Sequence, residues 1–205
     1  GSMFSGGGIG FQINAVNTVG ITVMLIIVTA FIAYMSFDAL IDAGNRETML
    51  ENKQIAYQIE QRYNRAVRIS SRVERGVQKQ LAAMPIEGSL DAIRAMLLDE
   101  MSESAGITSV GVILESPSES LNVYADNEGK TGEVQGAVQS DWYKIVKNTG
   151  KPFLAEPSAT QNGHLVARYV MPVEVNGQSI GVVCANIDLQ EIQKYVEKIS
   201  SKENY

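Results

Sequence analysis

The chain has 205 residues, of which 45% are hydrophobic and 20% are charged, a composition typical of a folded domain with one core. Its net charge of −6 argues against a nucleic-acid partner, because phosphate binding needs clustered lysine and arginine. The single cysteine, Cys184, excludes an internal disulfide framework. Because it lies in an apolar, strand-like segment, we interpret it as a small buried side chain and not as a nucleophile.

The N-terminal region carries no charge and leads into a long apolar stretch. Gly1-Ser2 before Met3 is typical of a tag remnant, so residues 1–14 are interpreted as that remnant and a glycine-rich flank. The apolar run within residues 15–37 is about 19 residues long, which nearly spans a hydrocarbon core of about 30 Å. A cleaved signal peptide has a shorter apolar run and a basic start. We therefore expect an uncleaved transmembrane helix at 15–37, with a buried helix as the alternative.

A second long helix is expected from about Phe37 to Ala83, because no proline occurs before Pro85. Residues spaced by three and four form one mainly apolar face of this helix. They are Ile55, Ile59, Tyr63, Val67, Ser70, Val73, Val77 and Leu81. This stripe is either a seam for dimerisation or the face that packs on the chain's own sheet, and both can hold for different parts of the helix.

The rest of the chain is expected to form short helices and strands. Ser89 and Ser140 are candidate N-caps of two short helices, which Gly106 and Gly150 would close. Five strands are expected, followed by a helix at 191–199 and a polar tail at 201–205. The strands are residues 107–115, 121–124, 152–156, 164–175 and 178–189. Tight links between strands favour an antiparallel sheet with helices packed on it, an α+β domain over residues 38–200.

The two longest strands flank Asn176-Gly177, a pair that tolerates the positive φ of a type I′ turn. This is a strong signal for a β-hairpin. Both arms are apolar at most positions, which predicts central strands covered on both faces. Pro172 has no N–H to donate, so a bulge or a gap in pairing is expected there.

Several segments, taken in order, resemble an extracytoplasmic Cache sensor domain, a relative of the PAS fold. They are the membrane helix feeding a long helix, Asp141-Trp-Tyr-Lys144 before Gly150-Lys-Pro152, Tyr169-Val-Met-Pro172 before the hairpin turn, and the closing strand Gly181 to Leu189. The resemblance covers about residues 37–200. It implies a PAS-like antiparallel five-stranded sheet with a long N-terminal helix, placed outside the inner membrane. It also implies a small-molecule ligand and signalling through membrane helices.

The amino-acid-binding members of this family carry a tyrosine and an arginine before a Trp-Tyr pair, and an aspartate in the closing strand. Trp142 and Tyr143 match that pattern, whereas Gln135, Ser140 and Asn186 stand at the tyrosine, arginine and aspartate positions. The fork for a carboxylate and the countercharge for an ammonium are therefore missing. The resemblance thus implies a ligand that is non-standard for amino-acid sensors, a carboxylate or another small polar metabolite.

Five residues are candidates for contact with this ligand: Trp142, Tyr143, Asn186, Arg168 and Tyr124. Trp142 and Tyr143 offer apolar faces with hydrogen-bonding tips, although packing of a helix on the sheet explains them as well. Asn186 is an amide within an apolar strand and needs a hydrogen-bond partner. Arg168 lies in the middle of a strand, where a ligand carboxylate, an internal acid or exposure to solvent would account for its charge.

No catalytic constellation, paired metal ligands or phosphate-binding loop is found in the sequence, so we expect neither an enzyme nor a bound cofactor or metal. The leading hypothesis is the sensing domain of a methyl-accepting chemoreceptor that forms a homodimer through its long N-terminal helix. The alternatives are the sensor domain of a histidine kinase or cyclase, and a type IV pilin-like structural subunit. Gly10-Phe11 resembles the pilin processing site, but Ala15 stands where pilins carry an acid.

Overall fold

The computed structural model describes residues 46–160 and 163–194, with side chains from Lys53 onward. The transmembrane helix expected at 15–37 therefore lies outside the described residues. Among the helices that are described, none is both long and apolar enough to cross a bilayer. Residues 62–189 form one compact unit, and the described residues 46–61 and 190–194 belong to another. The unit at 62–189 contains every strand described below.

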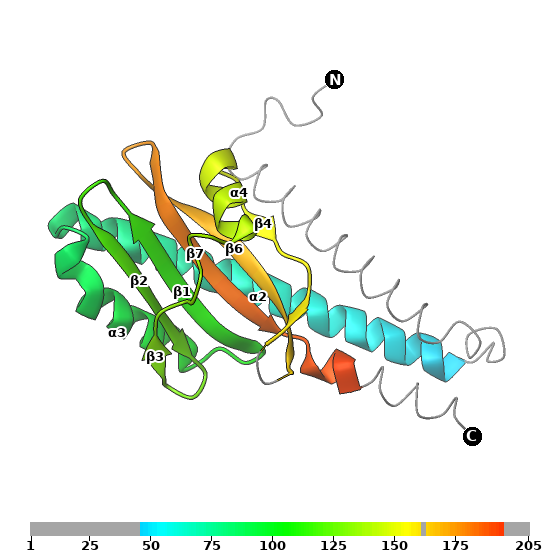
Figure 1. The fold of residues 1–205 in the computed structure, drawn as a ribbon. Helices are drawn as coiled ribbons and strands as arrows, with labels where there is room; N and C mark the ends of the chain where they lie inside the picture. Colours follow the sequence, from blue (N-terminus) through cyan, green and yellow to red (C-terminus); the bar gives the residue numbers. More distant parts are fainter. Residues whose placement is uncertain (1–45, 161–162, 195–205) are drawn as a thin grey trace. The chain divides into compact units, whose positions relative to one another are not determined.

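The described helices agree with the expected order (Figure 1). They are α2 (Arg46–Ala83), the 3₁₀ helix η1 (Glu87–Ser89), α3 (Leu90–Met101) and α4 (Asp141–Thr149), and residues 190–194 are helical as well. α2 confirms the described part of the predicted long helix. Gly150 ends α4 as predicted, because its φ of 65° is left-handed and glycine adopts that conformation without a steric penalty.

The N-cap position predicted for α3 is confirmed, but the expected cap hydrogen bond is not formed and the predicted closing glycine is wrong. Ser89 occupies the N-cap position, but its hydroxyl makes no cap hydrogen bond and donates instead to the Pro85 carbonyl at 2.7 Å. α3 ends at Met101, so Gly106 is not its closing residue. Gly106 has a φ of 81°, and a Cβ on it would lie 2.7 Å from Cγ of Arg62. This glycine therefore serves the turn into the first strand, where the Arg62 side chain of α2 passes over the backbone.

The strands form one antiparallel sheet in the order β3-β2-β1-β7-β6-β4, with β5 also paired to β6. They are β1 (Ile107–Glu115), β2 (Ser120–Asp126), β3 (Thr131–Gly132), β4 (Phe153–Leu154), β5 (Ser158–Ala159), β6 (Leu165–Val175) and β7 (Gln178–Asp188). The α+β class is confirmed, but the predicted number of five strands is wrong. The additional strands, β3 and β5, have two residues each, which is too short to show an alternation in the sequence.

The hairpin of β6 and β7 confirms the strongest prediction. Asn176 and Gly177 have φ values of 52° and 77°, as a type I′ turn requires. Pro172 stays in register opposite Val182, so the irregularity expected at the proline is displaced. The register shift lies between Val173 and Glu174 instead.

The two faces of the sheet are covered by different elements (Figure 1). Tyr169 of β6 packs edge-on against Tyr63 of α2, with ring centroids 5.7 Å apart, and α3 lies beside α2 on β1 and β2. The neighbouring residue Val170 points to the opposite face, where it belongs to an apolar cluster with Tyr143 and Val146 of α4. Because both faces are covered, the central strands are apolar on both sides, as the sequence predicted.

The apolar stripe of α2 is largely buried within the protomer. From Tyr63 onward, Tyr63, Val67, Ser70, Val73 and Val77 are all buried. Between a dimer seam and packing within the chain's own fold, the structure supports the second for this part of the helix. The hydroxyl of Ser70 is buried and has no hydrogen-bond partner among the described residues.

Candidate functional site

A row of polar side chains crosses the face of the sheet that α4 covers. Arg168 of β6 lies opposite Asn186 of β7, which lies opposite Ser109 of β1, which in turn lies opposite Asp126 of β2. Residues directly opposite one another in an antiparallel ladder share a face. Three of them are joined by hydrogen bonds, since Arg168 Nε donates to Asn186 Oδ1 at 2.9 Å and Asn186 Nδ2 donates to Ser109 Oγ at 3.0 Å.

Trp142 of α4 covers the end of this row that Arg168 forms. The guanidinium carbon of Arg168 lies 4.7 Å from the centre of the Trp142 ring, a cation–π arrangement. Arg168 is half-buried and forms no ion pair with a carboxylate anywhere in residues 53–160 and 163–194. Its Nε and its planar face are therefore engaged, whereas its two terminal nitrogens remain available as donors. A half-buried guanidinium with free donors can hold an anionic group.

The Tyr143 ring packs edge-on against that of Trp142, with ring centroids 6.4 Å apart, but its hydroxyl binds elsewhere. Its hydroxyl donates to Glu115 Oε2 at 2.7 Å, and Lys147 Nζ lies 3.0 Å from the same oxygen. Glu115 ends β1, six residues and therefore about 20 Å along the strand from Ser109. The hydrogen bond from the Tyr143 hydroxyl is the largest cause that lowers the pKa of Glu115. The pKa of Tyr143 is raised, mainly by burial and to a smaller extent by the same hydrogen bond. In this structure Tyr143 fixes α4 to β1 and does not contact the Arg168 row.

Tyr124 lies on the same face as the polar row but at its rim. It pairs with Gly111 of β1 on one side and with Gly132 of β3 on the other. A Cβ on Gly132 would lie 3.0 Å from Cε1 of Tyr124 and 3.2 Å from its hydroxyl, so this glycine provides the room for the ring. Three of the five predicted residues, Arg168, Asn186 and Trp142, are thus in mutual contact or joined through one another, and Tyr124 is separate from them.

The segment between β3 and α4 packs on the apolar part of the same sheet face, beside the polar row. Asn122 of β2 holds the backbone of Val134 twice, with Nδ2 donating to its carbonyl at 2.9 Å and its N–H donating to Oδ1 at 2.8 Å. The Val134 side chain packs on a cluster that includes Cys184 and Val170. A Cβ on Gly111 would lie only 3.0 Å from Cγ2 of Val134 and 3.1 Å from Sγ of Cys184. Val134 therefore occupies the space directly above Gly111.

The sequence did not point to Ser109 or Asn122, although both shape this face. Ser109 matters only through the register that places it beside Asn186, and no local pattern specifies that register. Asn122 alternates with apolar residues in Leu-Asn-Val-Tyr-Ala, which marks it as belonging to the opposite face from Leu121 and Val123. That alternation was the one signal by which it could have been found. Cys184 is buried on the same face, and burial raises the pKa of its thiol.

The comparisons with known proteins give a likeness of structure. No family model and no curated protein matches the chain. The periplasmic sensory domain of the Campylobacter jejuni chemoreceptor Tlp1 superposes with a TM-score of 0.57 at 13% identity, covering 70% of this chain and 60% of that one. The extracellular domain of the histidine kinase mmHK1S-Z3 superposes with a TM-score of 0.53 at 17% identity, covering 65% of this chain and 54% of that one.

The fold is like that of these two domains, one a periplasmic sensory domain and the other an extracellular domain. It agrees with the long N-terminal helix on an antiparallel sheet that the resemblance to Cache domains implied, but not with the implied five strands. The chain spans a little more than half the length of these structures. At identities of 13% and 17%, the sensor-domain likeness extends to the arrangement of helices and strands and carries no site residue with it.

Proposed function

We propose that this chain is the extracytoplasmic sensing domain of a transmembrane chemoreceptor and that it binds a small molecule on the face of the sheet covered by α4. The observation that carries the proposal is Arg168, a half-buried cation held in place by Trp142 and Asn186 without a carboxylate partner in the described parts of the chain. The fold supports it, because the structural neighbours are the sensory domain of a chemoreceptor and the extracellular domain of a histidine kinase.

The ligand that fits this face carries a carboxylate or a similar anionic group and a small apolar or polar body. Its anionic group would accept from the terminal nitrogens of Arg168, because a guanidinium offers parallel donors to two oxygens. The ring of Trp142 would cover the body of the ligand, and Ser109 and Asn186 would supply further hydrogen bonds. Asp126, the acid of the row, accepts hydrogen bonds from the N–H groups of Glu128 and Lys130 in its own turn and lies three strands away from Arg168, so it is a poor countercharge for an ammonium and the proposal disfavours ordinary amino acids. Tyr143 and Tyr124 remain candidates for contacts with a larger ligand.

Binding at this face requires Val134 to move. Its side chain fills the space above Gly111, and its backbone is held by the two hydrogen bonds from Asn122. Part of the binding free energy would therefore be used to displace the segment from Thr131 to Ser140. This makes the apparent affinity lower than the contacts alone would give.

The remaining parts of the proposal concern the whole receptor. Residues 15–37 would anchor the chain in the inner membrane, with the sensor domain periplasmic or extracellular, and the long N-terminal helix would contribute to a homodimer. The likeness to the histidine kinase domain makes a histidine kinase receptor the second candidate, since the sensor fold is common to both classes. The same likeness favours a sensor over the pilin-like structural subunit.

The test is a thermal-shift screen of the full chain in detergent micelles, followed by the fluorescence of Trp142, the only tryptophan. The library contains short carboxylates, amino acids, amines and purines. A ligand present at a hundred times its Kd adds about 2.7 kcal/mol to the free energy of unfolding. We expect a carboxylate to raise the Tm, and Arg168→Leu to abolish this rise.

Arg94→Leu is the matched control, because it removes an arginine from α3, on the other face of the sheet. It should leave the ligand-induced rise in Tm unchanged. Saturable binding that survives in a folded Arg168→Leu variant would place the ligand elsewhere. A screen in which no class of compound raises the Tm would contradict direct sensing of a small molecule.

A further inference from the structure

The outward face of α2 carries a stripe of positive charge. Arg68, Arg72, Arg75 and Lys79 are all exposed, and their spacing of four, three and four residues places them on one side of the helix. We call these four residues the basic stripe. Arg68, Arg75 and Lys79 form no ion pair with any side chain in the described part of the chain. The chain as a whole carries a net charge of −6, so this stripe runs against the overall balance.

The outward face of α3 and the turn after it carries the opposite charge. Asp91, Asp99 and Glu103 are exposed, and we call these three residues the acidic stripe. Asp91 pairs only with Arg94, one turn away on the same helix, through an exposed contact of 2.9 Å. Between Asp91 and Asp99 lie the exposed residues Ala92 and Ala95, whose small side chains allow a partner to approach the helix closely.

The two stripes lie side by side on antiparallel helices. Arg72 of α2 binds Glu100 of α3 through bidentate hydrogen bonds, the shorter of which is 2.8 Å. One turn further along α2, a Cβ on Gly76 would lie 2.5 Å from Sδ of Met96, one turn back along α3. Each step forward on α2 is therefore matched by a step back on α3. By this match Arg68 lies level with Glu103, Arg75 lies close to the level of Asp99, and Lys79 lies close to the level of Asp91.

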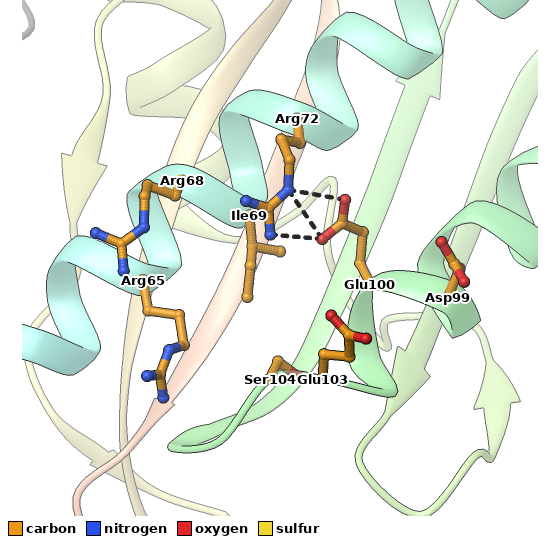
Figure 2. Close-up of a pocket in the computed structure, with 8 residues that line it drawn as sticks. All are labelled: Arg65, Arg68, Ile69, Arg72, Asp99, Glu100, Glu103 and Ser104. Atoms are coloured by element: carbon orange, nitrogen blue, oxygen red, sulfur yellow. Dashed lines mark hydrogen bonds and ion pairs between the residues drawn. The ribbon is translucent and has the colours of Figure 1, made fainter.

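An open polar cleft of about 380 Å³ runs between these helices (Figure 2). Ile69 forms part of its lining, Arg68 extends away from α3, and the Glu103 carboxylate projects into the space below Glu100 (Figure 2). The cleft has three arginines and three acids in its lining and so carries no excess charge. This balance disfavours a site for a free anion and leaves the two stripes as faces for a partner of mixed charge.

We propose that α2 and α3 together form a homodimer interface in which the basic stripe of each protomer faces the acidic stripe of the other. A two-fold axis that runs along the cleft, parallel to the helices, brings each residue opposite the residue at the same level on the neighbouring helix. The antiparallel match then sets Arg68 against Glu103 of the partner subunit, Arg75 against Asp99 of the partner subunit, and Lys79 against Asp91 of the partner subunit. Every unpaired cation thus meets an acid.

A dimer that pairs α2 with α2 through the same outward face is disfavoured by charge. The two-fold axis would then run along α2 itself and set the basic stripe against its own copy, at the level of Arg68, Arg75 and Lys79. Like charges in an interface cost free energy and direct the partners to another arrangement. The homodimer expected through the long helix is therefore proposed to pair α2 of each protomer with α3 of the other.

The proposed surface has the dimensions of a small interface. Residues 62–83 of α2 extend over about 33 Å at 1.5 Å per residue, and two helices side by side span about 20 Å. The product, roughly 650 Å² per protomer, lies slightly below the standard interface size of about 800 Å² per partner. Because its contacts are mainly exposed ion pairs, we expect a weak dimer whose association falls as salt is added.

The test uses disulfide cross-linking of the full chain in membranes, with two differently tagged copies that each carry one introduced cysteine. The native Cys184 is buried and does not interfere. We expect Arg68→Cys in one copy to cross-link with Glu103→Cys in the other, and Lys79→Cys with Asp91→Cys. Copies that both carry Arg75→Cys should form little cross-linked product. Efficient cross-linking of Arg75→Cys with itself, or no cross-linking of either mixed pair, would overturn the proposal.

Charge reversal gives a second measurement that does not depend on cysteine geometry. The combined change Arg68→Glu and Arg75→Glu should weaken dimerisation at least tenfold in sedimentation experiments on the full chain in detergent, and adding Asp99→Arg and Glu103→Arg should restore it. The matched control reverses two exposed lysines near α4, Lys144→Glu and Lys151→Glu, and should leave dimerisation unchanged. An equal loss in control and test variants, or no rescue in the fourfold variant, would refute the pairing. Neither measurement involves the ligand, so failure here leaves the proposed sensing function intact.

Discussion

The close approach of Val134 to Gly111 makes a quantitative prediction about the candidate ligand-binding face. In Gly111→Ala, the new Cβ would lie 3.0 Å from Cγ2 of Val134 and 3.1 Å from Sγ of Cys184. Val134 cannot easily retreat, because Asn122 holds its backbone with two hydrogen bonds. Overpacking of this kind costs about 1–3 kcal/mol of the free energy of unfolding. Val134→Ala alone removes two methyl groups from a half-buried side chain and should cost about 1 kcal/mol.

The two changes should compensate each other when they are combined. Val134→Ala removes the atom that the new methyl group would strike, and the new methyl group fills part of the space that Val134 leaves. If the sites were independent, the double variant would lose about 2–4 kcal/mol, the sum of the single losses. We expect a loss of about 1 kcal/mol instead, and hence a coupling of at least about 1 kcal/mol.

Urea unfolding followed by the fluorescence of Trp142 measures all four states of this cycle. Gly88→Ala in η1 is the control, because its Cβ would meet Sδ of Met84 at an ordinary contact distance of 3.4 Å. It should change the free energy of unfolding by less than about 0.5 kcal/mol. Additivity of the two changes within about 0.5 kcal/mol would show that Val134 does not occupy the space above Gly111.

Two further predictions concern the sheet and its attachment to α2. Gly181→Ala should prevent folding, as judged by far-UV circular dichroism, because the new Cβ would lie 2.0 Å from the carbonyl oxygen of Ile113 and 2.8 Å from Cα of Leu114, and backbone atoms cannot rotate away; a cooperative melt near that of the parent would contradict this. Burial, and then the Glu174 carboxylate, raise the pKa of Glu74 above its ordinary value of 4.5. The unfolded chain therefore ionises this group first, and stability falls as the pH rises from about 4.5 through the raised pKa. Glu74→Gln should be more stable than the parent at pH 7 and lose this advantage as the pH falls below 4.5; an advantage that does not change with pH would refute the assignment.

Local signals in the sequence account for the parts of the fold that were predicted. Asn176-Gly177 specifies its own turn, since few other pairs tolerate two positive φ values in succession. Gly150 likewise ends α4 through a conformation that the residue alone determines. The long helix follows from an uninterrupted period of three and four residues before Pro85. In each case the information lies within a few consecutive residues or in one repeated period.

The wrong predictions share a dependence on contacts that no pattern of consecutive residues specifies. Ser89 has a side chain suited to an N-cap, but its hydroxyl donates to the carbonyl of Pro85, four residues earlier, and not to the helix. Gly106 is needed because Arg62, 44 positions earlier in the sequence, passes over it. The strands β3 and β5 exist only because the edges of β2 and β6 offer backbone partners. None of these partners is visible in the residues that are next to one another in sequence.

The residues of the candidate site were predictable from the sequence where their own chemistry demands a partner, but their geometry was not. A charge at Arg168 and an amide at Asn186, each within an apolar strand, demand partners, and the structure joins the two directly. The sequence could not say that Trp142 alone would reach Arg168, because the directions of Trp142 and Tyr143 depend on the rotation of α4 about its own axis. In the structure Trp142 covers Arg168, whereas Tyr143 reaches Glu115. Adjacent residues of a helix point about 100° apart, so only one of the pair could face the polar row.

The construction of β6 gives a ligand on one face of the sheet a direct route to the helix on the other. Arg168 faces α4 and the proposed ligand, and the next residue, Tyr169, packs edge-on against Tyr63 of α2 at 5.7 Å. A displacement of β6 at Arg168 must therefore move the contact with α2, because a single peptide unit joins the two side chains. For such a movement to signal, the ligand must bind one arrangement of β6 more tightly than the other. Close-packed aromatic rings resist compression, so the Tyr63–Tyr169 contact favours a change of β6 between discrete positions over a continuous slide along α2.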